Sequence, residues 1–118
     1  MLLKNDYYTY RILWSEEDNE FIGLCAEFPS LSWLAKTQES ALKGIRSIVA
    51  DVIQDMKNSG EIIPQPITTK NYSGKISLRV TPDIHRNIAI QAAEAGLSVN
   101  KLLGYHLNTK FAAIQSIA

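Results

Sequence analysis

The sequence has one cysteine, two histidines and no long apolar run, and each shortage excludes a class of protein. Cys25 has no second cysteine with which to form an intramolecular disulfide. No clustered Cys/His set could hold a structural metal, so we expect neither a metal nor another cofactor. Residues 1–10 carry charges and tyrosines where a signal peptide needs an apolar segment, and no run reaches the roughly 18 apolar residues of a membrane span. We therefore expect a cytoplasmic protein without a membrane partner.

The chain also has no formal net charge at pH 7, because its 12 Lys and Arg residues balance its 12 Asp and Glu residues. The balance hides a division near Ser73. Residues 1–72 hold 7 basic and 10 acidic side chains, and residues 73–118 hold 5 basic and 2 acidic ones. A basic surface attracts phosphate and an acidic one repels it, so the two parts are expected to have different partners.

The first part has the pattern of a small antiparallel meander. Residues 7–14 alternate in the manner of a strand, and the polar run 15–20 predicts a hairpin turn. Residues 21–28 predict a second strand, and residues 32–35 a short third one.

A helix is predicted to follow this meander, with Thr37 as its N-cap and its end at Asn58. Apolar residues recur at steps of three and four and should face the sheet: Ala41, Leu42, Ile45, Ile48, Val49, Val52, Ile53 and Met56. Pro64 and Pro66 prevent a further helix but leave room for one extended piece around residues 62–67. We assign residues 1–66 to a β-β-β-α module and residues 67–73 to a linker.

Residues 74–118 predict a second domain in the order strand, helix, tight turn, helix. In the strand, Lys75, Ser77 and Arg79 point to one side and Ile76, Leu78 and Val80 to the other. The run Thr81-Pro82-Asp83 predicts a helix start. That helix should face inward with Ile84, Ile88, Ala92 and Ala95 and end at Gly96, and a second, capped by Ser98, should reach about Ala113.

A lone strand cannot satisfy its backbone groups or bury two helices, so a second copy of the chain is expected. Two such strands, paired antiparallel, form a ribbon that fits the major groove of B-DNA. The exposed face of that ribbon would carry Lys75, Ser77 and Arg79 from each copy. The simpler alternative is that Lys75 and Arg79 only keep the strand soluble. The expected assembly is a homodimer or a higher homo-oligomer.

The run from Lys75 to Asp83, followed by Ala95 to Lys101, resembles the ribbon-helix-helix repressors of the Arc/MetJ type. The resemblance implies double-stranded operator DNA as the partner, with Lys75, Ser77 and Arg79 reading base edges. It also implies that the backbone amides around Ser98, Val99 and Asn100 hold a phosphate. A helix N-terminus is an anion site, which agrees with that role.

Residues 6–66 resemble the N-terminal module of HicB-type antitoxins, in the meander that leads to Glu27-Phe28-Pro29 and in the spacing from Thr37 to Ala41. The chain departs from the family pattern at Ser30, where a glycine is usual, and at Lys36, where an acid is usual. The resemblance implies a degenerate ribonuclease H-like fold that binds a small basic HicA-like toxin, which cleaves messenger RNA. It does not identify the toxin-binding residues. The acidic side chains either meet the toxin or only keep the module soluble: Asp6, Glu16, Glu17, Asp18, Glu20 and Glu27.

The sequence thus predicts an α+β protein that is an antitoxin and a transcriptional autorepressor. The alternative is a stand-alone ribbon-helix-helix regulator whose first module senses another protein or a ligand. A nuclease using Glu27, Asp51 and Asp55 as metal ligands is a third reading. Asp51 and Asp55 lie one helical turn apart on a solvent face, so we expect no enzyme and no catalytic residue.

Overall fold

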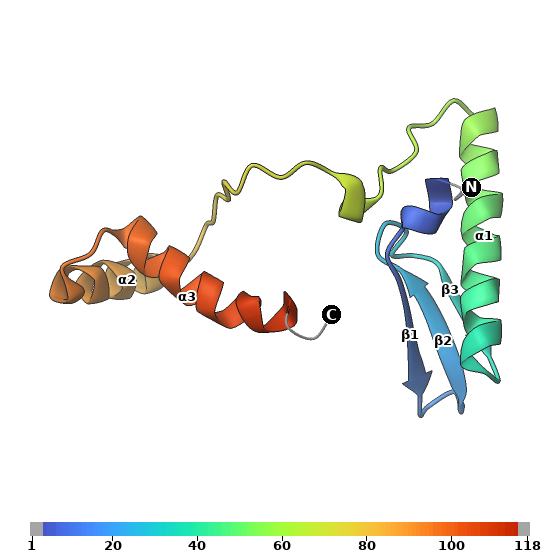
Figure 1. Ribbon diagram of the computed structural model, residues 1–118, viewed down its shortest axis with the longest axis horizontal. Helices are drawn as coiled ribbons and strands as arrows, with labels where there is room; N and C mark the ends of the chain where they lie inside the picture. Colours follow the sequence, from blue (N-terminus) through green and yellow to red (C-terminus); the bar gives the residue numbers. More distant parts are fainter. Residues whose placement is uncertain (1–3, 116–118) are drawn as a thin grey trace. The chain divides into compact units, whose positions relative to one another are not determined.

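The computed structural model describes the backbone of residues 4–115 and the side chains of residues 5–112. Within these residues the chain is α+β, with one three-stranded antiparallel sheet and three α-helices. It divides into two compact units, Met1–Ser73 and Gly74–Ala118, which we call the front unit and the rear unit. Figure 1 shows the front unit in blue to yellow and the rear unit in orange to red. No described helix is long and apolar enough to cross a membrane.

The sheet of the front unit confirms the predicted meander. Its strands are β1 (Tyr10–Ser15), β2 (Glu20–Cys25) and β3 (Ser32–Ala35), in the order β1-β2-β3. The turn between β1 and β2 places Asn19 at a φ of 53°. Asparagine tolerates this left-handed conformation better than most residues, which suits the tight hairpin.

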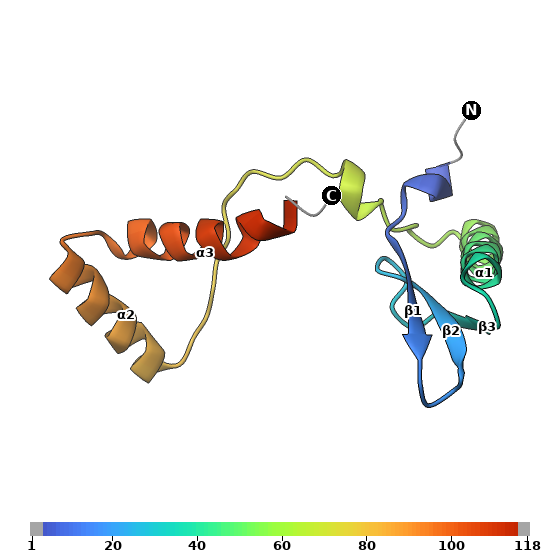
Figure 2. The same ribbon diagram turned by 60° about the horizontal axis from the view of Figure 1, so that its bottom comes forward.

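A single helix, α1 (Gln38–Asn58), covers one face of this sheet, as Figures 1 and 2 show. The predicted cap is present, because the side chain of Thr37 accepts a hydrogen bond of 3.1 Å from the Ser40 amide. The helix ends at Asn58 as predicted, with Ser59 as its C-cap, and Gly60 follows with a φ of 71°. This left-handed conformation is the usual stop signal of a helix.

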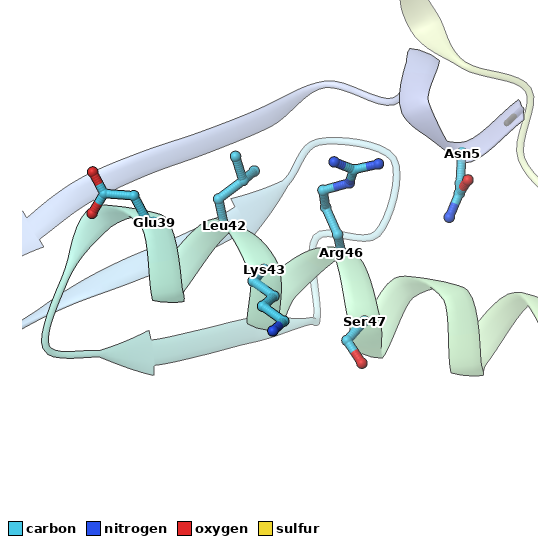
Figure 3. A pocket seen from close by; sticks show the side chains of 6 residues that line it. All are labelled: Asn5, Glu39, Leu42, Lys43, Arg46 and Ser47. Atoms are coloured by element: carbon cyan, nitrogen blue, oxygen red, sulfur yellow. The ribbon is translucent and has the colours of Figure 1, made fainter. Parts of the chain in front are cut away.

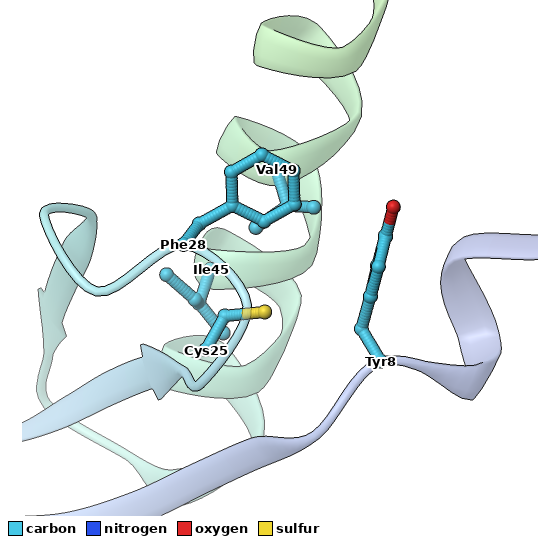
Figure 4. Packing of buried hydrophobic residues seen from close by; sticks show 5 residues of the cluster. All are labelled: Tyr8, Cys25, Phe28, Ile45 and Val49. Carbon is cyan, nitrogen blue, oxygen red and sulfur yellow. The ribbon is translucent and has the colours of Figure 1, made fainter. Parts of the chain in front are cut away.

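The core of the front unit lies between the sheet and α1 (Figure 4). It is formed by Tyr8, Cys25, Phe28, Ile45 and Val49. Ile45 and Val49 are fully buried, and the Tyr8 ring meets the Phe28 ring edge to face at a centroid distance of 5.4 Å. Each buried aliphatic side chain contributes about 1.5–3 kcal/mol to folding.

Two glycines let α1 approach the sheet closely. A Cβ on Gly23 of β2 would lie 2.6 Å from the Ala41 carbonyl oxygen, and one on Gly44 would lie 2.1 Å from the Trp33 indole. Real side chains essentially never make such short contacts. The missing side chains therefore set the spacing of the helix from β2 and β3.

The segment after α1 is attached to the front unit as far as Thr69. It contains no strand but ends in a short 3-10 helix, η2 (Ile67–Thr69). The Tyr8 hydroxyl donates to the Pro64 carbonyl at 2.6 Å, and the Thr68 hydroxyl donates to the Tyr7 carbonyl at 2.7 Å. Pro66 is fully buried. These contacts join the segment to the last residue of the first 3-10 helix, η1 (Lys4–Tyr7), and to the residue that follows it.

The rear unit contains α2 (Pro82–Ala95) and α3 (Val99–Gln115), close to the predicted helices. The Thr81 side chain accepts the Ile84 amide at 3.3 Å, which confirms the predicted N-cap. Gly96 takes the left-handed conformation with a φ of 70° and ends α2. A residue without Cβ adopts this conformation at no steric cost.

The predicted strand over residues 75–80 is not formed in the single chain, which corrects that part of the expectation. A strand requires a ladder of hydrogen bonds to a second strand. The sheet in the described residues contains only β1, β2 and β3. Of the four side chains expected to face inward from α2, Ala92 is buried and Ile88 half-buried, whereas Ile84 and Ala95 are exposed.

Candidate nucleic-acid interface

The predicted base-reading residues lie on the exposed segment that leads into α2. Lys75, Ser77 and Arg79 are all exposed there. The apolar residues between them are exposed as well, at 76% for Ile76, 64% for Leu78 and 45% for Val80. The segment therefore presents alternating cationic and apolar side chains to solvent.

The rear unit buries very little of its own apolar surface. Among its described side chains, only Ala92 of α2 and Leu102 of α3 are buried. A unit of this size needs a larger core to fold independently. Besides the three residues named above, its exposed large apolar side chains are Ile84, Ile90, Leu97, Tyr105, Leu107 and Phe111.

The predicted phosphate-binding residues lie at the start of α3. The Ser98 hydroxyl accepts a hydrogen bond of 3.1 Å from the Lys101 amide, so Ser98 caps the helix as predicted. The amides of Val99 and Asn100 belong to the first turn, where a helix offers no acceptor of its own. Ser98 and Asn100 are exposed and Val99 is half-buried. An anion can reach this helix end, where the helix dipole favours negative charge.

The two sets of predicted contacts are separated by the whole of α2. Lys75, Ser77 and Arg79 come before Pro82, and Ser98 follows Ala95. At a rise of roughly 1.5 Å per residue, a helix of this length separates its ends by roughly 20 Å. One chain therefore presents two separate contacts.

Glu27 has a structural role that the sequence did not reveal. Its carboxylate accepts hydrogen bonds from the amides of Thr9 at 2.9 Å and Ile67 at 2.8 Å. Partial burial acts to raise the pKa of Glu27, but hydrogen bonds from backbone amides, that of Ile67 foremost, hold it below its ordinary value. Glu27 thus joins the residue before β1 to the segment after α1. Ile67 lies 40 residues away in sequence, so no local pattern could have indicated this contact.

The three carboxylates considered for a nuclease do not form a metal site. Glu27 is held by the amides of Thr9 and Ile67, and Asp51 and Asp55 are exposed on α1. No group of three or more possible His, Cys, Asp or Glu ligands exists in the part of the chain that the structure describes. The arrangement offers no support for metal-dependent cleavage.

Several other acidic side chains of the front unit have neighbours within it. Asp6 pairs with Arg46. Glu16 accepts a hydrogen bond of 2.5 Å from the Trp14 indole, and Asp18 accepts one of 2.8 Å from the Ser15 hydroxyl. These contacts shape the hairpin turn and the start of the chain, and they do not identify a contact with another protein.

The front unit also has two hollows, neither of which includes a predicted DNA contact. Figure 3 shows the smaller, of about 430 Å³, which extends along α1 from Glu39 and Lys43 to Arg46 and Asn5. The larger, of about 820 Å³, lies between η1, the second half of α1 and residues 63–66. The charges that line the smaller hollow are of both signs.

A comparison with known protein families gives a match to most of the rear unit and to the segment before it. The HicB family model matches residues 59–107. The match covers 49 of the 118 residues and makes this part of the chain similar to proteins of the HicB family. It runs from the end of α1 through α2 into α3, so it shares only residues 59–66 with the resemblance noted above for the front module. No curated protein and no solved structure matches the chain.

Proposed function

We propose that this protein is an antitoxin that also represses transcription of its own operon. In this proposal two rear units form a ribbon-helix-helix dimer that binds operator DNA. The front unit neutralises a small basic HicA-like toxin that cleaves messenger RNA. The family match supports the role in a toxin–antitoxin system, and the exposed side chains of the rear unit support DNA binding.

The single observation that supports DNA binding most directly is the alternation of exposed side chains over residues 75–80. Ile76, Leu78 and Val80 are exposed in one chain although they are apolar. Antiparallel pairing with a second copy would satisfy the backbone and turn these side chains toward the four helices. The opposite face of the ribbon then carries only Lys75, Ser77 and Arg79.

Such a face has the chemistry for reading base edges. A two-stranded ribbon fits the major groove, where an arginine can bind guanine through two hydrogen bonds. We assign this role to Arg79 and Lys75, with Ser77 as an adaptable donor or acceptor. The amides of Ser98, Val99 and Asn100 would hold a backbone phosphate and fix the orientation of the protein on the duplex.

The front unit suits a basic protein partner through its charge. Residues 1–72 carry 10 acidic and 7 basic side chains, a net charge of −3. Opposite charges speed association and exclude wrong partners. When the toxin is in excess, its binding to the front unit could alter operator binding by the rear unit, so repression would follow the ratio of the two proteins.

A mobility-shift assay on the upstream DNA of the gene, at fixed salt concentration, tests this function. The variant Lys75→Ala/Arg79→Ala should lose discrimination against random DNA by about 1–3 kcal/mol for each base contact removed. The control Arg86→Ala/Lys110→Ala removes the same charge from exposed positions of α2 and α3. It should lower affinity for both DNAs alike. Failure of the unmodified protein to select its upstream DNA would refute the repressor function.

A further inference from the structure

One face of the front sheet has no cover within the described part of the front unit. The helix α1 lies against the other face, and Figure 2 shows no helix on this one. The register places Leu13 beside Ile22 and Ile22 beside Leu34, so one apolar row crosses all three strands. Leu24 extends the row along β2. We call these four residues the open face.

The orientation of the open face follows from the packing of its neighbours. Tyr10 and Ile12 pack against the core, and a Cβ on Gly23 would meet Ile45 of α1. Successive side chains of a strand point to opposite faces. Leu13 and Ile22 therefore point away from α1.

The open face is apolar at its centre and charged at its two ends. Leu13 is 40% exposed and Leu34 is 42% exposed, while Ile22 and Leu24 are half-buried. Arg11 lies beside Leu24 at one end of the face, and Glu20 lies on β2 at the other. The two ion pairs in the described residues, Arg46 with Asp6 and Arg86 with Asp83, include neither. Apolar patches of this kind on a folded unit usually mark an interaction site.

We propose that the open face packs against the open face of a second copy of this chain. Consider a two-fold axis that lies between the sheets and runs perpendicular to the strands. It sets the row of Leu13, Ile22 and Leu34 against the same row of the other copy. The same axis brings the Arg11 end of each sheet next to the Glu20 end of the other. Apolar side chains then meet at the centre, and opposite charges meet at both ends.

The charges favour a second copy over the basic partner of the proposed function. The open face has one cation and one acid at its ends, which complement each other under a two-fold axis but do not attract a basic protein. The acidic residues Glu16, Glu17 and Asp18 instead lie in the turn between β1 and β2. The oppositely charged ends of this sheet face are therefore suited to self-association.

This inference rests on the proposed dimer of rear units. A sheet of three short strands offers less area than a stable free interface requires. Joining two chains through their rear units raises the effective concentration of one front unit near the other, which makes a small contact sufficient.

The test is oxidative cross-linking of the full-length Ile22→Cys protein. Ile22 is central in the apolar row and close to the two-fold axis, so the introduced thiols of two copies should form a disulfide. The native Cys25 is only 2% exposed and should not react. Ser47→Cys, at an exposed position on α1, is the matched control and should stay uncross-linked.

Charge reversal then tests the orientation of the two copies. In the Ile22→Cys background, Arg11→Glu alone and Glu20→Arg alone place like charges together and should lower cross-linking about tenfold. When these two variants are co-expressed with different tags, the mixed pair regains opposite charges and should cross-link as the parent does. Equal cross-linking in all pairings would overturn the proposed arrangement.

Sedimentation of the same proteins separates this inference from the proposed function. A dimeric mass without any Ile22→Cys disulfide would overturn the open-face contact while leaving the rear-unit dimer intact. A monomeric mass would refute the rear-unit dimer itself. Alkylation of the introduced thiol gives a further comparison. If a basic toxin protects the thiol and self-association does not, the open face binds the toxin, and the inference is overturned.

Discussion

The front and rear units differ in how much of their fold one chain can complete. The front unit places α1 over a three-stranded sheet and buries Ile45 and Val49 completely. The rear unit leaves most of its large apolar side chains exposed and buries only Ala92 and Leu102 among its described residues. The same chain thus contains one unit with a buried core of its own and one that leaves most of its apolar surface exposed, for which we propose a second copy.

The reason for this difference is the number of strands in each unit. Three strands pair with one another in the front unit, so their central backbone groups are satisfied within the chain. The described part of the rear unit, up to Gln115, has one candidate strand, residues 75–80, and no other strand to pair with it. In the rear unit, pairing of residues 75–80 with the same residues of a second copy would both satisfy the backbone groups and bury the apolar side chains.

The largest expected effect is on the rear unit. Ile76→Ala should remove a side chain that is exposed in one chain but buried in the dimer, at a cost of about 2–5 kcal/mol for each copy. Because the dimer loses two such side chains, its dissociation constant should rise at least several hundredfold, as measured by sedimentation. Ser77→Ala, on the opposite face, should leave the mass unchanged. An unchanged dissociation constant for Ile76→Ala would mean that a second copy does not bury Ile76, which contradicts the proposed completion of the rear unit by a dimer.

Ile45→Ala tests the same comparison in the front unit. It opens a cavity in a complete core and should lower the free energy of unfolding by about 2–5 kcal/mol. Both tryptophans, Trp14 and Trp33, are in the front unit, so their fluorescence follows this transition alone. The loss should not depend on protein concentration, and operator binding should persist. A concentration-dependent loss would mean that the front core is also completed by a second copy.

The two N-caps give a smaller and matched pair of effects. Thr37→Ala and Thr81→Ala each remove a side-chain acceptor from a helix start and should each cost about 1 kcal/mol. Thr37→Ala should appear in the tryptophan transition, whereas Thr81→Ala should appear in the dissociation of the dimer. The appearance of both losses in one transition would show that the units unfold together.

The smallest expected effect is a dependence of front-unit stability on pH. The pKa of Glu27 lies below its ordinary value of 4.5 in the folded chain, so its contribution is present above that value. The contribution is lost as pH falls from 4.5 through the lower folded pKa. Glu27→Gln should flatten this part of the curve of tryptophan-detected stability against pH. Glu17→Gln, at an exposed position in the turn, should leave the curve as it is.

Local patterns predicted the three strands of the front unit and the three α-helices well, because caps and periodicity act between near neighbours. Thr37, Thr81 and Gly96 lie where the sequence placed the ends of helices, and β3 spans the predicted Ser32–Ala35. Long-range contacts could not be read in the same way. The packing of Trp33 against Gly44 and the contact of Glu27 with Ile67 depend on how elements come together in space.

The candidate site was only partly accessible to sequence reasoning. The alternation from Lys75 to Val80 predicts a two-sided strand, and in the single chain the side chains of both predicted sides are exposed. The strand itself could not form without a second strand, so its predicted conformation remains conditional on a dimer. The burial of Pro66 was missed, because a proline next to polar residues is typical of a linker.

Sedimentation equilibrium of a chain without residues 1–66, combined with circular dichroism, tests the central claim most directly. We expect a folded dimer whose helix content falls on dilution, since each rear unit has too small a core to fold alone. A folded monomer, with helix content independent of concentration, would contradict this claim.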